Sequence, residues 1–158
     1  MNRYEIVEGM YFLLDEELGI SIEEPLGDVV LKEGSYYLND MLHGPSVFKS
    51  KEGILLVQHW FYQGLRHGKG WQYYLSGALY SIERYNMGKK EGLQEYYYEN
   101  GRVRSQIPYV SGQLDQVVRL FWPGGNLKRE VGFVMGKRKG WDRIWLEDGA
   151  LKEELYAE

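Results

Sequence analysis

The sequence predicts an all-β protein: an elongated, single antiparallel β-meander or solenoid of about five 24-residue β-hairpin repeats with an N-terminal cap. Glycines recur every 24 residues, turn dipeptides recur with them, and β-prone runs flank those turns. Each such unit buries its apolar face only against its neighbours, so the period determines the architecture. The glycine columns are Gly53, Gly77, Gly101, Gly125 and Gly149; Gly64, Gly88, Gly112 and Gly136; and Gly44, Gly68, Gly92 and Gly140, the last interrupted at Gln116.

The copy around Asn100-Gly101 shows the repeating unit most clearly. Two β-type runs flank this dipeptide, and Asn-Gly favours a two-residue type I′ hairpin turn because both residues accept a positive φ. A second tight turn, from Gly88 to Gly92, links one hairpin to the next. The predicted units are approximately 44–67, 68–91, 92–115, 116–139 and 140–158.

A two-residue turn also assigns the two faces of the sheet. It would pair Tyr98 with Val103 on an apolar core face, and Tyr97 with Arg104 on a solvent face. The solvent face then carries an aromatic and cationic stripe, which includes the pairs Phe121–Lys128 and Trp145–Lys152. Aromatic residues and arginine anchor interfaces, so the stripe is the candidate partner-binding surface, with sheet stabilisation as the alternative. The candidate residues are Tyr73, Tyr80, Tyr97, Arg104, Phe121, Lys128 and Trp145.

The N-terminal segment, residues 1–35, is predicted to be an acidic cap on a repeat array of residues 36–158. Residues 1–34 hold nine acids and two bases, a net −7, so the rest of this −4 chain carries +3. Met10 to Leu18 followed by Gly19 could form a short helix, while Tyr11 to Leu14 and Gly19 to Ile22 could equally be strands. The acidity has two interpretations: a plain cap, or a segment that competes with an acidic partner for the array.

Composition and spacing exclude several kinds of chemistry. The chain has no cysteine, no apolar run of membrane-spanning length and no signal-peptide pattern, which favours a soluble, cytoplasmic protein. His43 and His67 occupy one repeat column about 10 Å apart, too far to share a metal. We expect no enzyme activity, catalytic residue, metal, cofactor or small-molecule substrate. An acidic chain does not favour nucleic-acid binding.

The segment from Tyr62 to Trp71, followed by Tyr73-Tyr74 and Gly77, resembles a MORN repeat. Tyr97 to Val103 resembles the bacterial MORN-repeat variants more closely, and some of those are labelled antitoxin-like. The resemblance covers residues of about 36–156 and implies an array of hairpins that acts as a scaffold for protein contacts.

Departures from the pattern at Pro108, Asp115 and Gln116 predict an altered turn or kink in the fourth unit. The expected function is a non-enzymatic protein–protein interaction scaffold whose partner is another protein. One alternative is a membrane-surface adaptor that binds anionic phospholipid through Lys89-Lys90 and Lys137-Arg138-Lys139. Another is an antitoxin-like protein that neutralises a partner by binding it.

Overall fold

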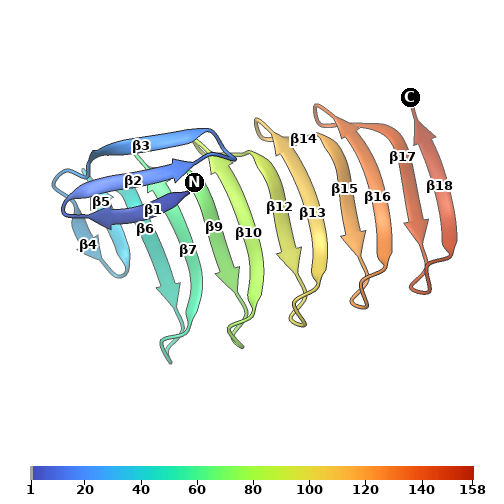
Figure 1. Cartoon of the computed structure of the whole chain (residues 1–158), viewed down its shortest axis with the longest axis horizontal. Coiled ribbons are helices and arrows are strands. Elements are labelled where there is room, and N and C mark those ends of the chain that lie inside the picture. Colours follow the sequence, from blue (N-terminus) through green and yellow to red (C-terminus); the bar gives the residue numbers. More distant parts are fainter. Residues whose placement is uncertain (1) are drawn as a thin grey trace.

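The computed structural model describes residues 2–158, and every regular element in that range is a β-strand (Figure 1). A three-stranded N-terminal sheet has the order β1-β2-β3, and a 15-stranded sheet follows the chain order from β4 to β18. Every strand pair is antiparallel. The predicted all-β hairpin meander is confirmed.

The N-terminal sheet contains β1 (Arg3–Val7), β2 (Met10–Asp15) and β3 (Ile20–Pro25). The large sheet begins with β4 (Val30–Lys32), β5 (Ser35–Leu38), β6 (Met41–Lys49), β7 (Leu55–Tyr62), β9 (Gly68–Tyr73) and β10 (Leu79–Asn86). It continues with β12 (Gly92–Tyr97), β13 (Val103–Val110), β15 (Gln116–Phe121), β16 (Leu127–Val134), β17 (Lys137–Trp145) and β18 (Leu151–Ala157). The two-residue strands β8 (Leu65–Arg66), β11 (Lys89–Lys90) and β14 (Gln113–Leu114) pair with the ends of β7, β10 and β13.

The hairpin turns are not the predicted type I′ turns. The Gly101 N–H donates to the Tyr98 carbonyl at 2.9 Å, and the Tyr98 N–H donates to the Arg102 carbonyl at 2.8 Å. Gly101 has a φ of 88°, whereas Asn100 is not among the residues with a positive φ. These features define a type I turn followed by a glycine bulge, which needs only one positive φ. The residue before the glycine can therefore vary between copies. The same pair of hydrogen bonds recurs at Gly53, Gly77, Gly125 and Gly149.

The longer turn changes the register of every hairpin. Tyr97 pairs with Val103 and Tyr96 with Ser105, so Arg104 is an extra, bulged residue. The predicted pairs Tyr98–Val103 and Tyr97–Arg104 are wrong. The predicted pairs Phe121–Lys128 and Trp145–Lys152 are wrong for the same reason, because these aromatic residues pair with Leu127 and Leu151.

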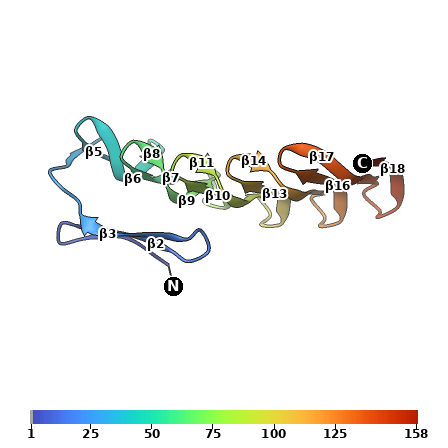
Figure 2. The same cartoon turned by 90° about the horizontal axis from the view of Figure 1, so that it is seen from above.

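The observed register defines two faces of the large sheet, because directly paired residues share a face and successive residues alternate. Face A carries Trp71 and Tyr97, and it is covered in part by the N-terminal sheet. Face B, on the opposite side, carries Tyr85 and Phe133. Figure 2 shows the N-terminal sheet on one side only, with the turns between hairpins curving toward the other side.

The N-terminal sheet supplies much of the hydrophobic core. Tyr11 and Leu13 are 0% exposed, and they pack with Trp60 of the array. The helix considered for Met10 to Leu18 is therefore wrong, and the strand alternative is correct. The sheet lies over face A of the first units, and β4 already belongs to the large sheet (Figures 1 and 2).

The expected kink in the fourth unit does not occur in the described chain. Pro108 pairs with Leu93 within the ladder, and Gln116 pairs with Phe133. Gln116 keeps the backbone shape of its glycine column by adopting a φ of 71°. At residue 116 the side chain therefore departs from the 24-residue period, whereas the backbone conformation follows it.

The turns between hairpins are held by one side-chain acceptor in each unit. His43 Nδ1 accepts the Gln63 N–H at 3.0 Å, and His67 Nδ1 accepts the Met87 N–H at 2.9 Å. In the next two copies a carboxylate takes the place of the imidazole, and Asp115 Oδ1 accepts the Met135 N–H at 3.0 Å. Both histidines therefore stabilise turns through a ring nitrogen that must remain unprotonated.

We expect the protein to lose stability as the pH falls from about 7.5 to about 5.5. Burial lowers the pKa of His43, His59 and His67 below the ordinary value. Their stabilising effect is complete above the unfolded-state pKa and is lost as the pH falls toward the folded-state pKa. The measurement is the urea midpoint at both pH values.

The control is the double variant His43→Asn, His67→Asn, because an asparagine oxygen can accept the turn N–H as Asp115 does. We expect a smaller midpoint change with pH in this variant, with His59 still contributing. A midpoint change equal to that of the unaltered chain would contradict the role of the two turn histidines.

Candidate interaction surface

The seven predicted site residues do not form one stripe, because the bulges distribute them over both faces. The four aromatic ones at the ends of the first hairpin strands lie in a row on face A, each paired with an aliphatic residue of the following strand. We call these pairs the aromatic row: Tyr73–Leu79, Tyr97–Val103, Phe121–Leu127 and Trp145–Leu151.

The aromatic row consists of aromatic and aliphatic side chains. Its four aromatic side chains are half-buried, and none belongs to the core formed with the N-terminal sheet. The Tyr97 hydroxyl donates to Glu95 at 2.8 Å, and burial with this hydrogen bond raises the pKa of Tyr97 to about 12. The Tyr97 side chain therefore stays neutral throughout the physiological pH range.

The three remaining predicted residues lie on face B. The Tyr80 ring contacts the Tyr74 and Tyr96 rings at centroid distances of 5.2 and 6.0 Å. Arg104 of the next unit lies 5.2 Å from the Tyr80 ring centroid and donates to its hydroxyl at 3.0 Å. Lys128 lies 4.6 Å from the Trp122 ring centroid. Arg104 and Lys128 therefore make cation–π contacts, but with Tyr80 and Trp122 instead of the predicted Tyr97 and Phe121.

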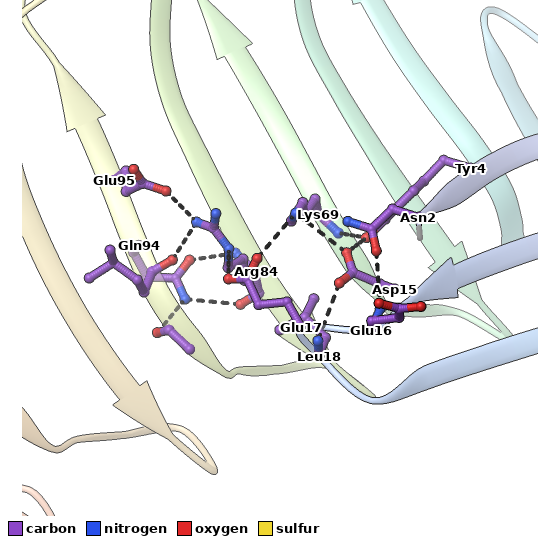
Figure 3. Close-up of polar contacts among 12 residues, drawn as sticks. Asn2, Tyr4, Asp15, Glu16, Glu17, Leu18, Lys69, Arg84, Gln94 and Glu95 are labelled. Atoms are coloured by element: carbon purple, nitrogen blue, oxygen red, sulfur yellow. Dashed lines mark hydrogen bonds and ion pairs between the residues drawn. The ribbon is translucent and has the colours of Figure 1, made fainter.

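The acidic N-terminal segment binds basic residues of the array on face A (Figure 3). Glu17 contacts Arg84 Nε at 2.7 Å and Lys69 Nζ at 3.3 Å through its two carboxylate oxygens. Asp15, which is buried, lies 3.7 Å from Lys69 Nζ and accepts the Tyr4 hydroxyl proton at 2.5 Å. That hydroxyl oxygen in turn accepts the Lys69 N–H at 2.8 Å. The acidic turn after β2 is thus paired with cations of the second unit.

Two glycines of the third column, Gly68 and Gly92, lie beneath the N-terminal segment, a role that the sequence analysis did not predict. A Cβ at Gly68 would lie 2.8 Å from the Tyr4 ring and 3.0 Å from Leu13. At Gly92 it would lie 3.6 Å from Leu18, whereas at Gly140 nothing lies within 4 Å. The sequence carries no signal for this coverage, because Gly140 belongs to the same column and lies in open space.

A buried carboxylate on face B has its hydrogen bonds supplied by the sheet itself. Glu83 accepts the Gln72 amide at 2.7 Å and the hydroxyls of Tyr85 and Tyr96 at 3.3 Å each. Within residues 2–158, no group of three or more histidine, cysteine or acidic side chains is arranged to hold a metal ion. We therefore read the Glu83 cluster as part of the structure of face B.

The fold and this surface define a repeat protein: an open row of hairpins with one partly covered face and one aromatic row. The family model described as MORN repeat variant matches residues 90–111, which lie within the third hairpin and its preceding turn. The chain thus contains a MORN repeat variant. No curated protein matches it, and nothing in these comparisons connects it with antitoxin-like proteins in particular. No helix in the described part of the chain is long and apolar enough to cross a membrane.

Proposed function

We propose that this protein is a non-enzymatic protein–protein interaction scaffold that binds its partner along the aromatic row of face A. The observation that carries the proposal is that face A already holds a folded β-sheet, the N-terminal one, against Trp60 and Trp71. In that contact, aromatic side chains of face A pack against the side chains of another β-sheet. The aromatic row continues the same face without such a cover.

The residue types of the row support this proposal. Tyrosine, tryptophan and phenylalanine are enriched at the centres of interfaces, where they contribute most of the binding energy. Two strands per unit separate neighbouring members by about 10 Å, so the row from Tyr73 to Trp145 extends for roughly 30 Å. A surface of this length suits a segment of another protein better than it suits a small molecule. The MORN match also supports a repeat-based binding scaffold.

The test replaces the row in its three later units with the variant Tyr97→Thr, Phe121→Thr, Trp145→Thr. Threonine favours strands, so we expect the β-sheet circular dichroism spectrum to persist. The affinity for a partner cross-linked and purified from the native cell should fall at least about tenfold. The readout is the dissociation constant measured with that purified partner.

The matched control changes face B at the same distance from the hairpin turns: Tyr80→Thr, Arg104→Thr, Lys128→Thr. This variant should bind the partner as the unaltered chain does. Equal binding by the face A variant and the unaltered chain would remove the aromatic row from the proposal. Antitoxin-like neutralisation would be one case of the same function, with a toxin as the partner.

A second candidate partner is an anionic lipid surface. Three exposed lysines, Lys89 of β11 with Lys137 and Lys139 of β17, lie next to the turns between hairpins, which stack along one edge of the sheet. Basic residues beside a membrane each contribute about 1 kcal/mol. Sedimentation with phosphatidylserine vesicles at about 0.15 M salt separates the two candidate partners. At this salt concentration the attraction between exposed lysines and anionic headgroups is well screened. An anionic lipid partner would be favoured if the unaltered chain binds the vesicles at this salt concentration and the variant Lys89→Gln, Lys137→Gln, Lys139→Gln does not. If the unaltered chain does not bind the vesicles, the lipid candidate is excluded.

A further inference from the structure

Face B contains an apolar groove over the fourth unit, on the side of the sheet away from the aromatic row. The groove has a volume of about 310 Å³, and Val118, Leu120 and Phe133 are among the residues that line it. Leu114 of β14 and Arg138 of β17 also line the groove, and both strands adjoin turns that curve toward face B (Figure 2). Its volume is at the lower end of the range of ligand pockets and suits one large side chain.

A contact that repeats in the preceding units is interrupted at the groove. In the preceding units a cation of a short strand lies over a tyrosine ring of the next unit. Arg66 lies 5.4 Å from the Tyr85 centroid, and Lys90 lies 5.2 Å from the Tyr109 centroid. One repeat after Lys90 and Tyr109, the equivalent residues are Leu114 and Phe133. The charge and the hydroxyl are both missing from this copy, and an apolar surface takes their place.

The rim of the groove carries a local excess of positive charge. Arg129 donates to the Asp142 carboxylate through Nε at 2.9 Å and through Nη2 at 2.8 Å. Arg138 Nη2 donates to the same carboxylate at 2.7 Å. The two arginine side chains are 40% and 45% exposed, whereas Asp142 is 6% exposed. Asp142 bonds to both guanidinium groups but does not line the groove, so the charged side chains among the lining residues are the two arginines alone.

The arginines keep hydrogen-bonding capacity beyond this ion pair. A guanidinium group carries five N–H donors, and the contact with Asp142 uses one from Arg138 and two from Arg129. Bonding to Arg129 lowers the pKa of Asp142, so the carboxylate stays ionised near neutral pH. Glu153 on β18 attracts Arg129 more weakly and does not line the groove. The rim can therefore accept a further anionic group.

We propose that this groove binds a segment of a partner protein in which a large apolar side chain is followed directly by a carboxylate. The apolar side chain occupies the space over Val118 and Phe133, and the carboxylate bonds to Arg138. The charge of the rim selects an acidic segment over a neutral one. This site is separate from the aromatic row, so each proposal can fail without the other.

The test uses capped hexapeptides as probes and the amide and methyl NMR spectra of the full chain as the readout. The first peptide places one phenylalanine before one aspartate among glycine and serine residues. The second has asparagine for the aspartate, and the third has alanine for the phenylalanine. We expect the first peptide to shift the signals of Val118, Leu120 and Val131, and to bind about threefold to fivefold more tightly than the second. The third should cause no shift at these positions.

Two protein variants complete the design. Arg138→Gln should bring the affinity for the aspartate peptide down to that for the asparagine peptide, while the spectrum shows an intact fold. Arg66→Gln, the same substitution at the equivalent position three units earlier, should leave both affinities unchanged, because Arg66 lies over Tyr85 and neither residue lines the groove. The proposal is overturned if the aspartate peptide causes no shift in the groove, if the two peptides bind equally to the unaltered chain, or if Arg66→Gln acts as Arg138→Gln does.

Discussion

Replacing Gly68 with alanine should lower the free energy of unfolding by about 3 kcal/mol and loosen the N-terminal sheet from the array. Gly68 has a φ of 88°, in the left-handed region where an L-residue costs about 1–2 kcal/mol. The added Cβ would also lie 2.8 Å from the Tyr4 ring and 3.0 Å from Leu13. Because both side chains pack in the core between the sheets, relieving these contacts costs roughly 1–3 kcal/mol more.

The control for Gly68→Ala is Gly140→Ala, because Gly140 belongs to the same repeat column. Its φ is 83°, and an added Cβ would meet nothing within 4 Å. This variant should lose only the backbone contribution of about 1–2 kcal/mol. Urea denaturation measures both losses, and the fluorescence of Trp60 and Trp71, whose rings lie 5.6 Å from Tyr4, reports on the contact. Equal losses in the two variants would contradict the role of Gly68 in docking the N-terminal sheet.

Replacing Leu13 with alanine should lower the free energy of unfolding by about 3 kcal/mol, through lost burial and the cavity that remains. Leu13 is 0% exposed and belongs to the core between the two sheets. Leu13 lies on β2, paired with β1 and β3 within the N-terminal sheet, and it packs against Trp60 of the array, so the substitution should destabilise both sheets. Urea denaturation followed by circular dichroism and by tryptophan fluorescence measures it.

Leu75→Ala is the matched control for this second variant, because it removes the same atoms from an exposed position. Leu75 is 68% exposed in the hairpin turn between β9 and β10. We expect a change of less than about 0.5 kcal/mol. If Leu13→Ala were as mild as Leu75→Ala, the N-terminal sheet would contribute little to the stability of the molecule.

The repeat, the strand order and the all-β class could be predicted because they depend on local signals. Glycines such as Gly77 and Gly101 mark turns wherever they stand in a regular pattern, and short turns make consecutive strands neighbours. Antiparallel pairing along the chain then follows without knowledge of distant contacts. The predicted meander therefore needed only the 24-residue period and the composition of the runs between turns.

The faces could not be predicted, because they depend on a single residue in the turn. A type I′ turn and a type I turn with a glycine bulge both end in glycine, so Asn100-Gly101 is compatible with either. A shift of one residue moves a side chain to the other face of a sheet. Pairing Tyr97 with Arg104 therefore united residues that the structure separates, since Tyr97 lies on face A and Arg104 contacts Tyr80 on face B.

The candidate surface, like the fold, could be predicted only in part from the sequence. That aromatic residues such as Tyr97 and Trp145 recur at one position in each unit follows from the 24-residue period alone. Which of these residues stay uncovered depends on how the N-terminal sheet packs on the array. Contacts between residues distant in sequence, such as Tyr4 with Lys69 and Glu17 with Arg84, set the acidic N-terminal sheet on face A. The hydrogen bonds of a turn join residues that are close in sequence, so the turns can be predicted from short segments. The packing of one sheet on another depends on the shapes and charges of side chains that are far apart in sequence.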